Sequence, residues 1–155
     1  MSSSIKAVMT KNIKTIPVGT TWQQANEVMV ESRIRHLPVV DDSGVVIGVL
    51  SQKDLLLADG IQELPIEFFM SAPVQALEET TPLKQAIYKM LEMKISCLLI
   101  TDKSDEVLGI VTTDDLLWFL ARQLEEADKK EAPLFNVLSL QTLGEVSRML
   151  AEVGI

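Results

Sequence analysis

Hydrophobic positions follow two kinds of pattern in the first third of the chain, and together they predict an α/β protein. Apolar residues recur at helical spacing after the capping residues Thr20 and Thr21, at Trp22, Ala25, Val28, Met29 and Ile34. Two short runs of aliphatic and β-branched residues follow, at 37–40 and 45–50, separated by a four-residue turn. So short a turn predicts an antiparallel hairpin, and a helix is expected to begin at Ser51.

The same pattern recurs later in the chain, because residues 9–57 align with residues 70–118 without a gap. The second copy predicts a helix after Thr80 and Thr81 with Pro82 in its first turn, strands over 97–100 and 107–111, and a helix from Thr112. Each copy opens with a short extended piece, at 13–16 or 74–77, so its order is β-α-β-β-α. Two such repeats are expected to pack as one module about a pseudo-twofold axis, with clefts in pairs.

Domain boundaries follow from the repeat. We expect one repeat over 1–60, a second over 61–122, and a helical tail over 123–155. The last helix of the second repeat is expected to extend through Trp118 and Arg122 into the charged stretch 125–131. Residues 142–145 have the form of a capping box and open an amphipathic helix. That helix can pack on the chain's own core or on a second subunit.

Composition and charge exclude several classes of protein. With 155 residues, 47% hydrophobic and 23% charged, the chain predicts a compact domain. A net charge of −8 argues against a nucleic-acid partner, and the whole excess falls in residues 61–155, which hold eight Lys or Arg against sixteen Asp or Glu. No apolar run approaches the ~18 residues of a membrane span, and the N-terminus lacks a signal-peptide pattern, so we expect a cytoplasmic protein without a membrane partner.

A chemical motif closes each repeat, at residues 48–54 and 109–115, with the form Gly, two hydrophobic residues, Ser or Thr, two variable residues and Asp. A helix N-terminus at this point would offer unpaired N–H groups that favour a phosphate. An Asp three residues after the hydroxyl can accept hydrogen bonds from the vicinal hydroxyls of a ribose. The alternative is an ordinary capped helix, but two copies in register favour the binding interpretation.

The combination of these segments resembles a CBS domain pair, also called a Bateman module, over roughly residues 5–120. The resemblance rests on residues 8–10, 34–41 and 48–54 and on their counterparts 69–71, 95–102 and 109–115. It implies a regulatory module that binds AMP, ADP, ATP or S-adenosylmethionine in clefts between the repeats, with no obligatory cofactor.

The resemblance also implies the site residues. One cleft would hold phosphate and ribose at Ser51, Lys53 and Asp54, with the base against Thr15, Ile16, Pro17, Arg35, His36, Leu37 and Pro38. The other cleft would use Thr112 and Asp115, with the base against Ala76, Leu77, Ser96, Cys97 and Leu98. The second copy departs from the pattern at Leu99 and Thr101, where the first has Pro38 and Val40.

Neither catalysis nor metal binding is indicated. His36 is the only histidine and Cys97 the only cysteine, so neither has partners at metal-ligand spacing, and no nucleophile motif or paired-carboxylate pattern lies near His36. We therefore expect no enzyme. Cleft-lining packing or a hydrogen bond to ligand is the expected role of His36, and Cys97 is expected to be an inert packed thiol.

The leading hypothesis is a stand-alone regulatory module that passes ligand occupancy to an effector protein, and it is expected to be a homodimer because the apolar stripes of the final helices exceed what one core needs. The alternative is a ligand-free dimerisation or interaction scaffold.

The clefts are expected to differ, because Lys53 with Arg33 or Arg35 serves the first, while Asp114 and only Lys94 serve the second. Lys53 and Asp114 can also both point to solvent, where screening removes the difference.

Overall fold

A computed structural model describes residues 4–58 and 60–129 of the chain. The chain forms two compact units, residues 1–116 and residues 117–155. Within the second unit, residues 117–129 are helical, and the end of the chain, with its predicted amphipathic helix at 142–153, lies outside the described residues. The account below concerns the first unit.

The first repeat folds as a three-stranded sheet with two helices. Its elements are listed in chain order: the 3₁₀ turn η1 (Ile5–Ala7), β1 (Ile16–Pro17), α1 (Trp22–Ser32), β2 (His36–Val40), β3 (Val46–Ser51) and α2 (Gln52–Leu57). Strand β2 is central, parallel to β1 and antiparallel to β3, as the predicted hairpin requires.

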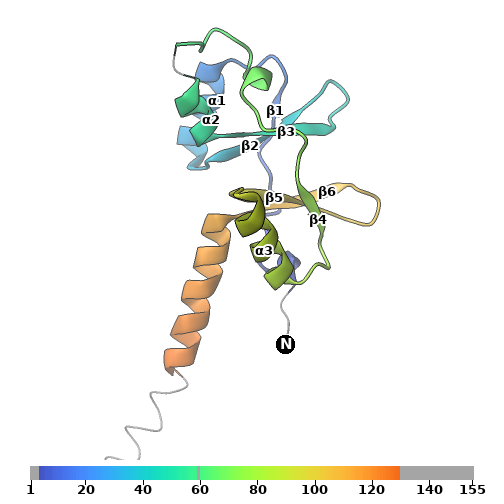
Figure 1. The fold of residues 1–155 in the computed structure, drawn as a ribbon, viewed down its shortest axis with the longest axis vertical. Helices are drawn as coiled ribbons and strands as arrows, with labels where there is room; N and C mark the ends of the chain where they lie inside the picture. The colour runs from blue at the N-terminus through green and yellow to red at the C-terminus, as the bar shows by residue number, and fades with distance from the viewer. Residues whose placement is uncertain (1–3, 59, 130–155) are drawn as a thin grey trace, which may run out of the picture. The chain divides into compact units, whose positions relative to one another are not determined.

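The second repeat reproduces this arrangement with nearly the same bounds, shifted by 61 residues. Its elements are η2 (Ile66–Phe68), β4 (Ala76–Glu78), α3 (Leu83–Met93), β5 (Cys97–Thr101) and β6 (Val107–Thr112), and a helix begins at residue 113. Even the irregularity in the hairpin recurs, between Val39 and Val40 and between Ile100 and Thr101. The predicted α/β fold with two β-α-β-β-α repeats is confirmed, and Figure 1 shows the two sheets with their helices.

The local signals for the helices were correct in the first repeat and only partly so in the second. The Thr21 side chain accepts from Gln24 N at 3.2 Å, and Gln24 returns the bond, so α1 begins with a full capping box. The helix α3 is present as predicted, but its expected start was wrong, because Pro82 is the N-cap and no side chain caps the helix. The Thr81 carbonyl accepts from Ile5 N at 2.9 Å, and this bond belongs to an extended backbone that ends at Pro82.

The first sheet packs α1 and α2 against it through a core of aliphatic residues. In the first repeat, α1 contributes Ala25 and Met29, and the fully buried residues of the sheet include Leu37, Val39 and Leu50. The indole Nε1 of Trp22 donates to the Leu55 carbonyl at 2.9 Å, which ties α1 to α2. Complete burial of one such leucine contributes about 2 kcal/mol relative to exposure.

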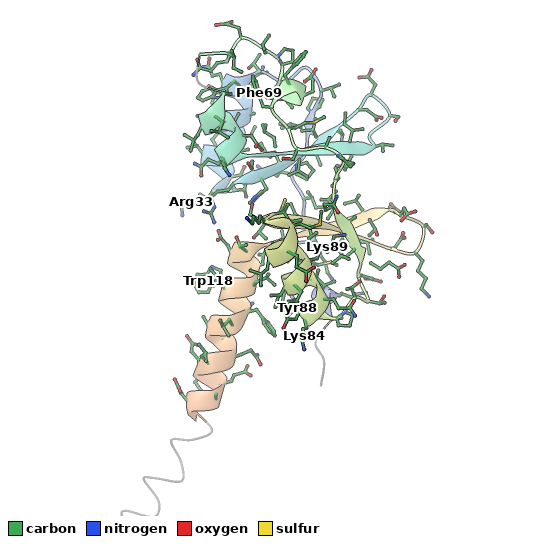
Figure 2. All side chains as sticks on the ribbon, in the orientation of Figure 1. Arg33, Phe69, Lys84, Tyr88, Lys89 and Trp118 are labelled. Atoms are coloured by element: carbon green, nitrogen blue, oxygen red, sulfur yellow. The ribbon has the colours of Figure 1, made fainter. Side chains whose placement is uncertain are left out.

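The leading segments of the two repeats are exchanged. Ile66 and Phe69 follow the connector to the second repeat, yet they pack in the core of the first, and Figure 2 shows Phe69 there. In the reciprocal contact, Thr10 forms a β-bridge with Ile110 of the second sheet, and Ser71 forms the equivalent bridge with Val49 of the first. The repeats are therefore joined by crossing strands as well as by packing.

Candidate functional site

The start of α2 closes a hydrogen-bonded ring on itself. The backbone N–H and the hydroxyl of Ser51 both donate to Oδ2 of Asp54, at 2.7 and 2.6 Å, and Asp54 N donates to the Ser51 hydroxyl at 3.2 Å. Gln52 N donates to the Arg35 carbonyl at 2.9 Å. Most of the donors that were expected to be free for a phosphate at this helix start, those of Ser51, Gln52 and Asp54, are therefore engaged within the chain, by the motif's own side chains and a neighbouring carbonyl.

The second copy of the motif has the same geometry. Thr112 donates through its backbone and its hydroxyl to Oδ2 of Asp115, at 2.7 and 2.8 Å, and Asp115 N donates to the hydroxyl at 3.3 Å. In both copies this bonding uses Oδ2 of the aspartate, and Oδ1 takes no part in the cap. Within the described residues, Oδ1 of Asp115 has only a 3.5 Å contact from the Thr10 hydroxyl, and Oδ1 of Asp54 accepts no bond.

A cavity of about 570 Å³ lies beside the first motif, and both repeats build it. It is open to the carboxylate of Asp54. The first repeat lines it with His36, Val49, Ser51, Lys53, Asp54 and Leu57, and the second with residues 70–75, 93–97 and Leu99. Residues 70–75 reach the cavity because the exchanged segment bridges to Val49 at Ser71. A second hollow of about 240 Å³ is lined by Arg35, His36, residues 51–53, Leu56, Ser96 and Thr113.

The structure regroups the residues that the sequence analysis assigned to two separate clefts. Ser51, Lys53 and Asp54 share the larger cavity with His36, and Ser96 and Cys97 join them from the group expected around the second motif. Arg35 lines the smaller hollow instead.

The other expected contact residues lie elsewhere. The side chains of Leu37, Pro38 and Leu98 are fully buried in the core. Neither described cavity is lined by the remaining expected residues, which are Thr15, Ile16, Pro17, Ala76, Leu77, Thr112 and Asp115.

Several lining residues were not predicted. Among them are Met70, Pro73 and Val74 of the crossing segment, and Met93 and Lys94 at the end of α3. One sequence signal pointed to the crossing segment, since residues 70–73 lie just before the extended piece predicted at 74–77 and belong to no helical pattern. No comparable signal marked the end of α3 as part of a site formed with the first repeat.

Two polar contacts join the repeats next to the cavity. Nε2 of His36 and the hydroxyl of Ser96 lie 2.7 Å apart in a hydrogen bond. The guanidinium of Arg35 pairs with the carboxylate of Asp114 at 2.5 Å. Both contacts connect the start of a strand or the residue before it in one repeat to a polar residue of the other.

Burial shifts the pKa of two titratable groups at this junction, His36 and Cys97. Loss of solvent, with a smaller contribution from Arg35, lowers the pKa of His36 below 6.5, although Asp114, Asp54 and Asp115 act in the opposite direction. Burial also raises the pKa of the Cys97 thiol to about 11, with Asp54 adding to the effect. At neutral pH, therefore, His36 is uncharged and Cys97 is a thiol rather than a thiolate.

Comparison with known proteins identifies both repeats. The family model of the CBS domain matches residues 5–60 and 64–122. The CBS domain pair of protein MJ0100, solved with 5-methylthioadenosine and S-adenosyl-L-methionine, is 25% identical and has a TM-score of 0.74, over 79% of this chain and 99% of that one. CBSX2, solved with AMP, is 28% identical with a TM-score of 0.65, over 79% and 98% of the two chains.

Sequence relatives show the same module in different settings. A CBS domain-containing protein of Dictyostelium discoideum is 29% identical over 81% of this chain and 96% of its own length. A homoserine O-acetyltransferase of Methanococcoides burtonii is 29% identical over 74% of this chain. The chain spans only 23% of that enzyme, 24% of a second homoserine O-acetyltransferase and 22% of an L-aspartate semialdehyde sulfurtransferase, so the match does not extend over their whole length. Within the described residues, no helix is long and apolar enough to cross a membrane.

Proposed function

Because the chain belongs to the CBS domain family, we propose that it is a regulatory module that binds an adenosine-containing ligand in the cavity beside Asp54. The observation that carries the proposal is the unengaged Oδ1 of Asp54 at a cavity of about 570 Å³, a volume within the range of small-molecule sites. Two structural neighbours were solved with adenosine-containing molecules, which supports the ligand class.

The cavity offers separate surfaces for the two parts of a nucleoside. The carboxylate of Asp54 is held in place by Ser51, so Oδ1 can accept from vicinal ribose hydroxyls without the entropic cost of ordering a free side chain. The purine would pack against an apolar wall drawn from both repeats, which includes Val49, Met70, Pro73 and Ile95.

Calorimetry and thermal melting with AMP, ADP, ATP and S-adenosylmethionine test the proposal. We expect binding and a rise in melting temperature, since a ligand at 100 times its dissociation constant adds about 2.7 kcal/mol to the free energy of unfolding. Asp54→Asn should weaken binding at least about tenfold because the amide nitrogen cannot accept from a hydroxyl.

The matched control is Asp41→Asn, at an exposed carboxylate that accepts from Ser43 and Val45 in the β2–β3 turn. This variant should bind like the unaltered protein. If millimolar concentrations of all four compounds produce neither heat nor a melting shift, the module is not a receptor for adenosine ligands and the scaffold alternative gains.

Signalling to a partner would need a surface that responds to occupancy, and we propose that the exposed apolar side chains of the helices form a homodimer contact. Leu56 of α2 and Leu91 of α3 are 73% and 67% exposed. Leu55, next to Leu56 on α2, is buried in the core and cannot contribute.

Light scattering should therefore give about twice the chain mass of 17.2 kDa at micromolar concentration. Leu56→Glu or Leu91→Glu should shift the mass toward the monomer, because a carboxylate in an apolar contact is strongly destabilising. The matched control is Lys103→Glu in the β5–β6 turn. A monomer at micromolar concentration for the unaltered protein would contradict the dimer.

A further inference from the structure

Two cations occupy an unusual backbone position at the ends of equivalent helices. Arg33 after α1 and Lys94 after α3 have φ angles of 53° and 54°, in the left-handed region where helix ends usually carry glycine. A residue with a side chain is less favourable than glycine in this region. The positive charge of each side chain interacts favourably with the C-terminal end of its helix, and this offsets part of the cost. That interaction does not explain which cavity or surface the side chain reaches.

The position of Lys94 gives it a second role. Lys94 lines the larger cavity together with Lys53, so each repeat contributes one lysine to the lining. Neither lysine forms an ion pair within the described residues. Asp54 is the only carboxylate in the lining, and His36 is uncharged at neutral pH.

The lining therefore carries a net positive charge when Asp54 is ionised. If Asp54 binds a ribose, both ammonium groups stay available for another part of the ligand. A phosphate would form charge-assisted contacts with them, whereas a sulfonium would be repelled and a neutral nucleoside would gain nothing.

We propose that Lys53 and Lys94 make the larger cavity selective for phosphorylated adenosine ligands over adenosine itself and over S-adenosylmethionine. This inference rests on the proposed function, because it assumes that an adenosine ligand occupies the cavity. It assigns to Lys94, a residue of the second repeat, a share in a site whose aspartate comes from the first.

The second copy of the motif lacks the same pair of cations. Asp114 stands 61 residues after Lys53, and Arg33 stands 61 residues before Lys94. Asp114 is paired with Arg35, which reduces the charge of both groups toward a ligand. Figure 2 shows Arg33 at the edge of the first repeat that is turned toward the second. At these two equivalent positions the second copy thus has one cation and one carboxylate, where the first has two cations.

The test is the ratio of dissociation constants for adenosine and ATP, measured by calorimetry on the full chain and on Lys53→Gln and Lys94→Gln. The ratio compares two ligands on one protein, so a partial loss of folded protein cancels. We expect ATP to bind at least about tenfold more tightly than adenosine, and each substitution to reduce the ratio about three- to tenfold. Lys94→Arg keeps the positive charge and should keep the ratio of the unaltered protein. Lys103→Gln, in the exposed β5–β6 turn, should leave the ratio unchanged.

Salt and S-adenosylmethionine complete the experiment. Raising sodium chloride from 50 to 500 mM should narrow the ratio in the unaltered protein, because exposed ammonium groups are screened. Equal affinity for ATP and adenosine, tighter binding of S-adenosylmethionine than of ATP, or a ratio that neither glutamine variant changes would overturn the role of the lysines and leave the proposed function intact. Failure of adenosine and ATP alike to bind would overturn the proposed function itself.

Discussion

His36 lies at the junction of the two repeats, where burial and the nearby charged groups both act on the pKa of its imidazole. It begins β2, lines the larger cavity and bonds to Ser96 across the repeats. The charged groups that face it are Arg35, Asp114, Asp54 and Asp115, and the net effect of its surroundings with burial is a lowered pKa. Protonation of His36 is therefore unfavourable in the folded protein compared with the unfolded chain.

This shift predicts the direction of a pH effect on stability. Because the pKa of His36 is lower in the folded state than the 6.5 of an unperturbed histidine, its contribution is fully present above pH 6.5 and is lost as the pH falls through the folded pKa. The only histidine of the chain gives a single pair of ring resonances, so a nuclear magnetic resonance titration measures that pKa directly.

His36→Gln is the companion variant, and it should flatten the fall in the free energy of unfolding just below pH 6.5. The difference between the two proteins over this pH range therefore measures the effect of His36. A titration midpoint above 6.5 in the folded protein would contradict the prediction.

At the scale of elements, β3 and β6 are each crossed by the leading segment of the other repeat, and a glycine marks both crossings. A Cβ atom at Gly48 would overlap the side-chain sulfur of Met70, whereas one at Gly109 would lie 2.8 Å from the Thr10 carbonyl oxygen. That carbonyl is held by a 3.0 Å bond from Ile110 N. A methionine side chain can change rotamer, but a backbone carbonyl in a β-bridge cannot move without breaking the bridge.

Gly109→Ala should therefore be more destabilising than Gly48→Ala, although the two positions are equivalent in the repeat. We expect about 1 to 3 kcal/mol for Gly109→Ala, the range of overpacking substitutions, and less than about 1 kcal/mol for Gly48→Ala. Chemical denaturation with urea measures both values. Equal losses would show that the Thr10 segment yields as easily as the Met70 side chain.

Most elements were predictable from local pattern, and the failures have a common origin. The helix from Trp22 and the hairpins followed from spacing and turn length, because these depend on neighbours in sequence. The extended pieces were predicted too early, since β1 and β4 begin only at Ile16 and Ala76, where pairing with β2 and β5 starts. Further upstream, Thr10 and Ser71 pair with the sheet of the other repeat, which a local pattern does not report.

The same limit applied to the site. Asp54 and its hydroxyl partner Ser51 were identified from the repeated motif, and the structure places both at the larger cavity. The cavity residues that come from the second repeat, among them Lys94 and residues 70–75, lie far from Asp54 in sequence. Analogy between repeats predicted which residues are equivalent but not which copies lie together.

At the scale of the whole molecule, the exchanged segments predict that damage appears in the repeat opposite to the one that is mutated. Ile5 and Ile66 are equivalent, and both are fully buried. Ile66 N bonds to the Thr20 carbonyl of the first repeat at 3.2 Å, and Ile5 N bonds to Thr81 of the second at 2.9 Å. Figure 1 shows the N-terminal segment beside α3.

Replacing either isoleucine by alanine should cost about 2 to 5 kcal/mol through the cavity that is left. Hydrogen exchange of backbone amides locates the effect. Ile5→Ala should accelerate exchange in β5 and β6, and Ile66→Ala should accelerate it in β2 and β3. If exchange rises first in the repeat that holds the substituted residue in sequence, the crossing does not carry the stability assigned to it.

The exchange also changes the molecularity of folding. A fragment of residues 5–60 would lack the Ile66 segment that covers its sheet. Its own Ile5 segment would lack the second repeat, on which it packs in the full chain. Such a fragment could form both contacts only by binding a second copy, so its stability would rise with protein concentration. Joined in one chain, the two halves meet at a fixed effective concentration set by the connector. The folded module is then independent of dilution, and concentration remains free to control the association of whole chains.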